Sequence, residues 1–412
     1  MKLLHTADWH LGARFHGQRR GSEEDDALDQ VIRHCRDEGV DAMLIAGDVF
    51  DNANPGAVDE RRYYRTLARL VRDAGVATVV VVAGNHDSAL RLEGPRELAR
   101  AMGVHVVGRL GREDDAEQAV VPLTARDGRV AGVCVALPYL RDGDLRLPEI
   151  GESQRQIHER YVVALGHRYT EARDAARRLH PGQPLVVMGH LQVEGGTFGG
   201  EERNVQFGGR GTPDAETLAG DAAYLALGHL HRPQDVGERH WRYCGSLLPT
   251  GFDETGTQRE VILVELGSSS GESRIRRLPM RPFRVYRRIH GDLSRVEGEI
   301  EALPEASADA TPWCEVLVDL EGPRPGLAPH LVDRCRARGW NLVSVRRQTT
   351  PGVIEAGGPS VRRALHELTP EEVFIRRHDE EYGTHPDDEL MEEFQSLLES
   401  LDHEAPTPEE VD

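Results

Sequence analysis

Lysine is nearly absent from this 412-residue chain, whose 50 basic side chains are Lys2 and 49 arginines. We attribute the bias mainly to coding composition, with phosphate binding by the arginines as the alternative. Cysteine is scarce as well: the five cysteines are scattered, odd in number and without a Cys-x-x-Cys pair. This pattern argues against a disulfide framework or a zinc ribbon and favours reduced thiols in a cytoplasmic protein.

Long apolar runs are also lacking. No stretch approaches the roughly 20 apolar residues that a membrane span needs. The first ten residues, MKLLHTADWH, contain no apolar signal core. We therefore expect no membrane contact, and a chain of this length should form two or three domains with a sizeable core.

The chain also has no excess of basic residues, and its formal net charge is −20. Residues 379–412 hold 14 acidic side chains and no Lys or Arg, so residues 1–378 carry 56 acidic against 50 basic side chains, a net charge of −6. This balance argues against strong DNA binding by the chain alone. It does not exclude a nuclease whose partner protein grips the DNA.

What the chain does contain is five short polar motifs, each directly after an apolar run. The motifs are Asp8-Trp9-His10, Gly47-Asp48, Gly84-Asn85-His86-Asp87, Gly189-His190 and Gly228-His229-Leu230-His231. The runs before them are Lys2–His5, Ala42–Ile45, Val79–Val82, Leu185–Val187 and Tyr224–Leu227. Such runs are typical of buried strands in a parallel sheet, and ligands collect at the carboxyl ends of such strands.

Convergence of the five strand ends would bring two Asp, one Asn and four or five His to one crevice, which is enough for two metal ions. Each motif alone is weak evidence, because a single Gly-His is more often a hydrogen-bonded histidine and Gly-Asn-His-Asp can be a polar turn. Mixed carboxylate, imidazole and amide ligands favour Mn²⁺ or Fe²⁺, with Zn²⁺ possible and Mg²⁺ less favoured. Two metal ions can lower the pKa of a bound water to generate a hydroxide, and they can hold a phosphoryl group. A histidine that binds neither ion can act as the general acid that protonates the leaving oxygen.

Helical patterns alternate with the strand-like runs, which predicts crossover connections. Helices are expected after a cap at Ser22–Asp25, over Asp59–Asp73 and Leu98–Met102, and within Asp142–Pro181. A separate small α+β unit is expected from about residue 281, with strands at Phe283–Ile289, Cys314–Leu320 and Leu342–Arg346 and helical segments between them near Leu293–Leu303 and Leu327–Arg338. Near the end, one face of an amphipathic helix carries Leu390, Phe394, Leu397, Leu398 and Leu401. That helix either packs on its own domain or docks a partner protein, and we favour docking.

The ordered motifs resemble those of the calcineurin-like metallophosphoesterase superfamily. The segments 5–12, 46–51, 83–88, 226–232 and 243–246 are similar to the SbcD family of nuclease subunits from bacterial SbcC–SbcD complexes. The resemblance implies an α/β fold with a sandwich of two mixed β-sheets flanked by helices, a small α+β capping domain and C-terminal helices. The implied domains are a nuclease domain (1–275), a capping, DNA-recognition domain (281–370) and an ATPase-binding segment (371–412).

The resemblance also implies the roles of the site residues. The first metal would be held by Asp8, His10, Asp48 and His231, and the second by Asp48, Asn85, His190 and His229. The catalytic pair would be His86, which binds no metal and assists the leaving group, and Asp87, which orients His86 through a hydrogen bond. At Asp51 this chain has an aspartate where archaeal and eukaryotic relatives often carry histidine, so a second catalytic histidine is not assumed.

The implied activity is that of a Mn²⁺-dependent DNA nuclease, an ATP-dependent exonuclease on double-strand ends and an endonuclease on hairpins and single strands, in DNA repair, recombination and replication. Its partner would be an SbcC-type coiled-coil ATPase, in a heterotetramer built on a nuclease homodimer, in the cytoplasm at the nucleoid. We expect the self-contact at the helices over Asp59–Asp73 and Leu98–Met102. The alternatives are a two-metal phosphatase acting on small or protein phosphoesters and a non-catalytic scaffold. A scaffold is disfavoured because such proteins lose ligands and none of the seven is missing.

Overall fold

The computed structural model describes residues 1–111, 114–145, 153–197, 212–237, 241–267, 273–306, 310–320, 322 and 324–348, with five single residues beyond them. The chain divides into two units, Met1–Thr350 and Pro351–Asp412. No helix within the described ranges is long and apolar enough to cross a membrane.

Two six-stranded sheets form the larger part of the first unit. In spatial order the first sheet contains β14 (Ser273–Pro279), β13 (Glu260–Leu266), β1 (Lys2–Thr6), β4 (Ala42–Ala46), β5 (Thr78–Val82) and β6 (Val104–Val107). The second contains β11 (Gln234–Val236), β12 (Trp241–Tyr243), β10 (Tyr224–Gly228), β9 (Leu185–His190), β8 (Val130–Ala136) and β7 (Val120–Thr124). Parallel pairs fill the middle of both sheets and antiparallel strands lie at edges, which confirms the expected mixed sheets.

The apolar runs become strands because both of their faces are buried. Every residue of β4 and β5 is buried. Alternate side chains such as Leu44 and Val80 pack toward the second sheet, while Met43 and Val79 pack under the helices. A strand that is covered on both faces needs apolar residues at every position. This explains why the runs are continuously apolar and do not alternate between apolar and polar residues.

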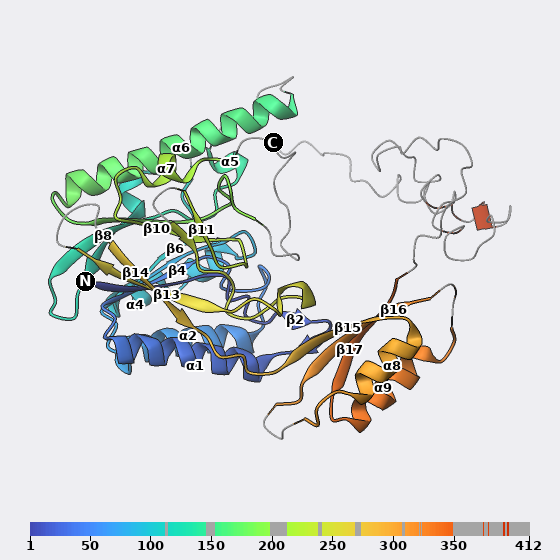
Figure 1. The fold of residues 1–412 in the computed structure, drawn as a ribbon. Helices are drawn as coiled ribbons and strands as arrows, with labels where there is room; N and C mark the ends of the chain where they lie inside the picture. The colour runs from blue at the N-terminus through green and yellow to red at the C-terminus, as the bar shows by residue number, and fades with distance from the viewer. Residues whose placement is uncertain are drawn as a thin grey trace. The chain divides into compact units, whose positions relative to one another are not determined.

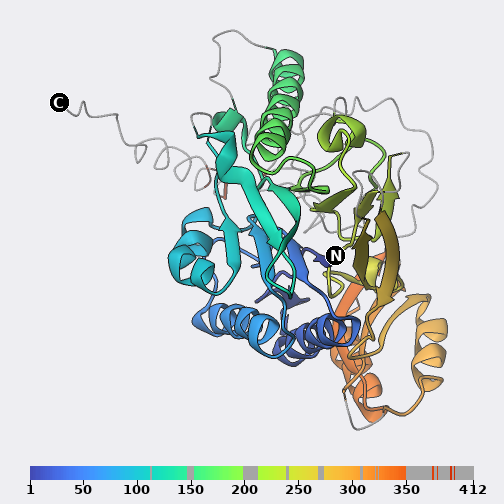
Figure 2. The same ribbon diagram turned by 90° about the vertical axis from the view of Figure 1, so that its left-hand side faces the viewer.

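Helices cover both outer faces of this sandwich. Figures 1 and 2 show α1 (Gly21–Glu38) and α2 (Ala57–Arg72) on one side and α6 (Gln154–Leu179) and α7 (Ala215–Ala219) on the other. The shorter elements are α3 (Ala89–Glu93), α4 (Arg96–Ala101), α5 (Asp142–Leu145), the 3-10 turns η1 (Ala116–Ala119) and η2 (Phe252–Glu254), and a hairpin of β2 (Arg14–Phe15) and β3 (Gln18–Arg19). Ser153 caps α6 in a reciprocal pair with Gln156, whereas the expected cap of α1 at Ser22 is wrong: that helix begins at Gly21 without a side-chain cap.

A smaller layered domain follows the sandwich. Its sheet is β15 (Tyr286–Gly291), β16 (Trp313–Asp319) and β17 (Asn341–Gln348), joined by α8 (Leu293–Glu301) and α9 (Leu327–Ala337). All three strands are parallel, because each connection is a crossover helix. The described part of this domain therefore has the order β-α-β-α-β, which is the succession of strands and helices that the sequence predicted. Both helices share one core with the sheet, built around Ile289, Val316 and Leu331.

Beyond residue 350 the structure describes Phe374, His378, Leu390, Met391 and Phe394, all in helical conformation. The rings of Phe374 and Phe394 stack at 4.0 Å. Of the expected amphipathic face, Leu390 and Phe394 are therefore helical. Leu397, Leu398 and Leu401 lie outside the described residues.

Candidate metal centre

The five polar motifs meet at the carboxyl ends of strands from both sheets. The loops after β1, β4 and β5 come from the first sheet, while β9 and β10 deliver the others from the second. The loops are tied together by backbone bonds, in which the amides of Asp8 and His10 donate to the carbonyls of Gly47 and Asp48, both at 3.0 Å. The convergence expected from the sequence is thus present, but it spans two sheets.

Unusual backbone angles concentrate at this place. Among the described residues, five that are not glycine have positive φ, and four of them are predicted ligands: Asp8 (50°), His10 (43°), Asp48 (48°) and His229 (104°). Non-glycine residues rarely adopt this conformation, which costs free energy and persists where the surrounding structure imposes it. Here it turns each ligand out of its strand end into the crevice.

Two motif glycines are needed because ligands approach them closely. A Cβ built on Gly47 would lie 2.6 Å from Cγ of His190, and one built on Gly84 would lie 2.7 Å from Cγ of Asp48. Real Cβ atoms essentially never come within 3.0 Å of such atoms. The glycines therefore let the imidazole and the carboxylate reach the centre.

Asp48 lies in the middle of the cluster. Its Oδ2 is 3.6 Å from Nε2 of His10 and 3.4 Å from Nε2 of His190. The ring nitrogens Nε2 of His10 and His231 are 3.1 Å apart. Asp8, His10 and His231 form one group with metal-ligand spacing, and Asp8, Asp48 and His190 form another.

Asn85 completes the set on the other side. Its Oδ1 lies 3.0 Å from Nε2 of His190 and 3.0 Å from Nδ1 of His229. Asp8 accepts from the backbone amide of His229, which ties the first motif to the last. The structure thus gathers all seven predicted ligands, and this mixture of nearly buried nitrogen and oxygen donors fits a divalent ion.

Burial sets the protonation of the metal-free cluster. It lowers the pKa of His10 and of His229 to about 3, which leaves both imidazoles neutral and able to donate to a metal. Burial likewise raises the pKa of Asp8 to about 7. For His190, burial acts to lower the pKa, but the neighbouring Asp48 carboxylate outweighs it and raises the pKa to about 9. A bound cation would replace the proton of His190.

His86 is held by Asp48 and by the carbonyl of Asp51, and not by Asp87. Its amide donates to Oδ1 of Asp48 at 2.9 Å, and its Nδ1 donates to the carbonyl of Asp51 at 2.7 Å. The prediction that Asp87 accepts a hydrogen bond from His86 and so orients its ring is wrong. The carboxylate of Asp87 accepts from the amides of Val49 (3.1 Å), Phe50 (2.9 Å) and Gly84 (2.9 Å) instead, and so fastens the third loop to the second.

A cavity of about 240 Å³ opens over the cluster. It is lined by His10, Ala13, Arg14, Asp48, Asp51, Asn85, His86, His229, His231 and Thr250. His86 also has metal-ligand spacing with His10 and Asp51, so the spacing alone does not distinguish it from a ligand. Arg14 adds a guanidinium at the edge, which suits an anionic substrate.

Sequence reasoning missed Glu254. Its Oε1 accepts from Nδ1 of His231 at 3.0 Å, and its Oε2 accepts from Arg259 at 2.8 Å. Burial acts to raise the pKa of Glu254, but His231 and Arg259 lower it to about 2. Glu254 belongs to η2, which follows no strand end, so no local signal marked it.

Comparison with known proteins gives matches over both domains. Residues 1–233 match the family model described as calcineurin-like phosphoesterase. Residues 279–382 match the model described as type 5 capsule protein repressor C-terminal domain.

Among curated proteins, the chain is similar to the SbcD subunit of nuclease SbcCD from Rhodobacter capsulatus, with 36% identity over 67% of this chain and 69% of that protein. It is similar to the protein of the same name from Escherichia coli K12, with 29% identity over 98% of this chain and 100% of that protein. The Bacillus subtilis protein of this name is 34% identical over 64% of this chain and 66% of its own length.

Proposed function

This chain belongs to the calcineurin-like phosphoesterase family as a metal-dependent nuclease of the SbcD type, and we propose that it cuts DNA within a complex with an SbcC-type coiled-coil ATPase. The observation that carries the proposal is the convergence of the seven predicted ligand side chains, with Asp48 in their middle and with His86 bonded to Asp48 and to the carbonyl of Asp51. Within the complex we expect exonuclease action on double-strand ends and endonuclease action on hairpins and single strands.

We propose two divalent ions in this centre, most favourably Mn²⁺, with Fe²⁺, Mg²⁺ or Zn²⁺ as alternatives. Asp8, His10, Asp48 and His231 would hold one ion, and Asp48, Asn85, His190 and His229 would hold the other. The position of Asp48 between His10 and His190 supports a bridging role. Bound ions would supply Lewis acidity and lower the pKa of a coordinated water.

The protein's own groups would do the rest. With Nδ1 of His86 engaged by the carbonyl of Asp51, Nε2 is the ring atom left to carry a proton for the leaving oxygen. Arg14 would steady the phosphate from the edge of the cavity. Asp87 would act through the loops, because its carboxylate fixes the turn that carries Asn85 and His86.

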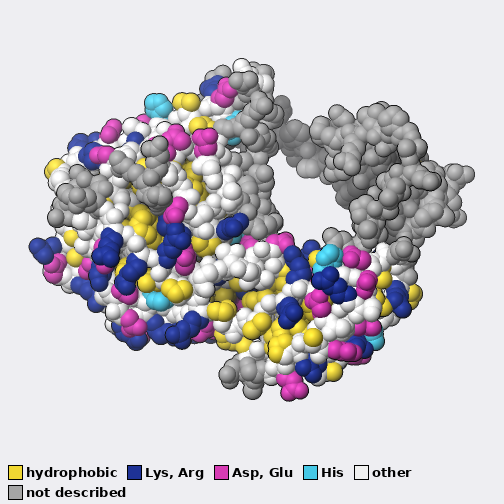
Figure 3. All heavy atoms as spheres, in the orientation of Figure 1, with side chains coloured by type: hydrophobic (Ala, Val, Ile, Leu, Met, Phe, Trp, Pro, Cys, Tyr) yellow, Lys and Arg dark blue, Asp and Glu magenta, His cyan; other side chains and the backbone are white. Residues whose placement is uncertain are grey.

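The charge distribution supports a partner that helps to grip DNA. On the face shown in Figure 3, the Lys and Arg side chains are interspersed with Asp and Glu side chains. We propose that residues 379–412, with 14 acidic side chains, meet the ATPase and not the DNA. We also propose a nuclease homodimer formed through α2 and the segment Leu98–Met102, which includes the end of α4, because Val58, Leu98 and Met102 are exposed. Because the relatives are bacterial nuclease subunits, we also propose that the chain acts in the cytoplasm, at the nucleoid.

Cleavage of a hairpin DNA in the presence of Mn²⁺ tests this function. His86→Ala should lose most of the cleavage, whereas the matched control His167→Ala, on the exposed side of α6, should retain it. p-Nitrophenyl phosphate is the comparison substrate. Turnover of the small ester without any DNA cleavage would favour the phosphatase alternative, and equal cleavage by wild type and His86→Ala would refute the role of His86.

A further inference from the structure

The short turn η2 touches three different parts of the first unit through its three residues. Glu254 contacts the ligand His231, Phe252 packs where the small domain meets the sandwich, and Asp253 pairs with a strand of the small domain. Because the three residues are consecutive, a displacement of one displaces the others.

Glu254 fixes the orientation of the His231 ring. It is 2% exposed, and it also accepts from Thr250, through the hydroxyl at 2.9 Å and the amide at 3.0 Å. Arg259 donates to both its carboxylate (2.8 Å) and its carbonyl (3.0 Å). With Nδ1 of His231 bonded to this anchored carboxylate, Nε2 is the atom presented beside His10. A carboxylate behind a ligating imidazole is a common means of fixing its tautomer and direction.

Phe252 belongs to an aromatic cluster shared by both domains. Its ring lies 4.9 Å from that of Phe15 on the β2–β3 hairpin and 6.3 Å from that of Tyr286 on β15. Trp313 of β16 packs on the same Phe15 ring at 5.7 Å. Phe15, Phe252 and Trp313 are all buried. The position of the small domain against the sandwich, which we call its seat, therefore constrains the position of Phe252.

Asp253 makes the polar link. Its carboxylate accepts from Nη1 of Arg288 on β15 at 2.5 Å. Nε of the same guanidinium donates to Glu315 of β16 at 2.7 Å, and Glu315 is fully buried. Arg288 is therefore held by the small domain on one side and by η2 on the other.

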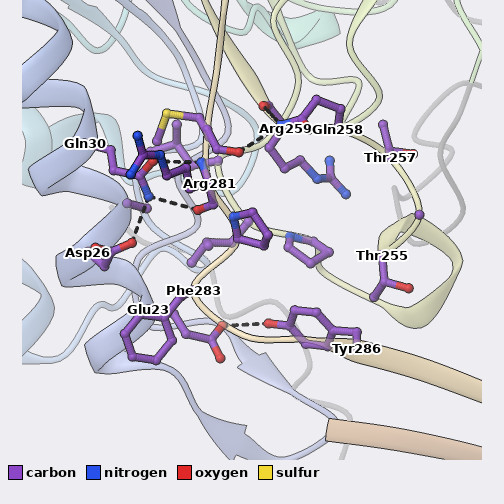
Figure 4. A pocket seen from close by; sticks show the side chains of 17 residues that line it. Glu23, Asp26, Gln30, Thr255, Thr257, Gln258, Arg259, Arg281, Phe283 and Tyr286 are labelled. Atoms are coloured by element: carbon purple, nitrogen blue, oxygen red, sulfur yellow. Dashed lines mark hydrogen bonds between the residues drawn. The ribbon is translucent and has the colours of Figure 1, made fainter. Parts of the chain in front are cut away.

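Other contacts hold the two domains together independently of η2. The hydroxyl of Tyr286 donates to Glu23 of α1. The side-chain amide of Gln30 donates to the carbonyl of Arg281 and accepts from its backbone amide (Figure 4). Beside them lies a cavity of about 240 Å³ between α1, the loop 255–259 and the linker 280–283, as Figure 4 shows. The junction is thus fastened at α1, and the cavity borders the loop 255–259, which directly follows η2.

We propose that η2 couples the seat of the small domain to the metal centre, with Glu254 as the positioning residue of His231. A small domain correctly seated through Arg288 and the aromatic cluster holds His231 in the direction that ligation needs. Loss of that seat turns His231 away and weakens the metal site without removing any ligand.

Mn²⁺ binding by the purified full-length chain tests the coupling, measured from the electron paramagnetic resonance signal of the free ion. Glu254→Ala should weaken binding by roughly 10–100-fold. Glu254→Gln should restore most of the affinity, because its amide oxygen still accepts from Nδ1. Arg288→Ala, which removes no group near the metal ligands, should weaken binding several-fold.

Arg287→Ala is the matched control, because Arg287 is the exposed neighbour of Arg288 on the same strand. It should bind Mn²⁺ as the wild type does, and melting curves establish that all variants are folded. Wild-type affinity in a folded Arg288→Ala protein would overturn the coupling, whatever the Glu254 variants do. A wild type that binds no Mn²⁺ would refute the metal centre itself and the coupling with it, so the two failures are distinguishable.

Discussion

Replacing Gly84 by alanine should disable the nuclease with a single methyl group. The new Cβ would lie 2.7 Å from Cγ of Asp48 and closer still to its Oδ1 and backbone nitrogen. Ordinary contact begins at 3.4 Å and the backbone nitrogen of Asp48 would lie about 1.0 Å closer than that, so the two loops must separate by about 1.0 Å. Because the methyl also meets the backbone of Asp48, a rotation of that side chain cannot relieve the contact. Gly84 does not have positive φ, so the change tests packing and not backbone strain.

The expected loss follows from the size of that displacement. Moving a catalytic group by about 1 Å can cost roughly 10²-fold in rate. We therefore expect Gly84→Ala to cut hairpin DNA on the order of 10²-fold more slowly than the wild type at saturating Mn²⁺. The matched control is Gly298→Ala in α8, where an added Cβ meets nothing within 4 Å. It should leave cleavage unchanged. If Gly84→Ala cleaved DNA and bound Mn²⁺ as well as the wild type does, a side chain at position 84 would not displace Asp48, and the explanation given for this glycine would be refuted.

Three further outcomes are expected. In Asp87→Ala, three buried amides lose their acceptor, so the free energy of unfolding measured in urea should fall by about 1–3 kcal/mol or more. An unchanged unfolding midpoint would contradict the view that Asp87 holds the third loop to the second. The pKa of His190 is raised to about 9 in the metal-free protein, so protonated His190 stabilises the fold fully below its ordinary value of 6.5 and progressively less as the pH rises through 9. Metal-free wild type should therefore lose more stability between pH 6 and pH 9 than His190→Gln, and parallel melting profiles of the two would count against the His190–Asp48 ion pair. Deleting residues 379–412 should abolish co-purification with a coiled-coil ATPase and spare Mn²⁺-dependent cleavage of hairpin DNA; a truncated chain that still binds the ATPase would place the docking surface elsewhere.

The strand ends were predictable because the reasons for them are local. β4 and β5 are apolar runs that are followed by small and polar residues, Gly47-Asp48 after β4 and Ala83-Gly84-Asn85 after β5, and the structure places the strands where the pattern indicates. Pairing was not predictable in the same way. β1 pairs with β13 across more than 250 residues of chain, and nothing in the two segments specifies that partner. The division of the five motifs between two facing sheets follows from such pairings.

Errors arose where a tertiary contact replaced a local one. Asp87 follows His86 in the chain, so a hydrogen bond between them was expected. In the structure the carboxylate of Asp87 instead accepts from the backbone amides of Val49 and Phe50, which lie far from it in the sequence. At α1, Ser22 looked like a cap, whereas the helix starts at Gly21, beside an ion pair between Arg20 and the buried Glu23.

The sequence by itself determined which ligand types this protein offers, their order, and the strands that carry them, because those features depend on burial and on residues adjacent in the chain. The tertiary structure alone decided that Asp48 lies between the imidazoles, that the carbonyl of Asp51 holds His86, and that Glu254 stands behind His231. The last of these joins residues 23 positions apart through a turn whose Phe252 packs against Trp313 of the small domain, so it depends on contacts between residues that are distant in the chain.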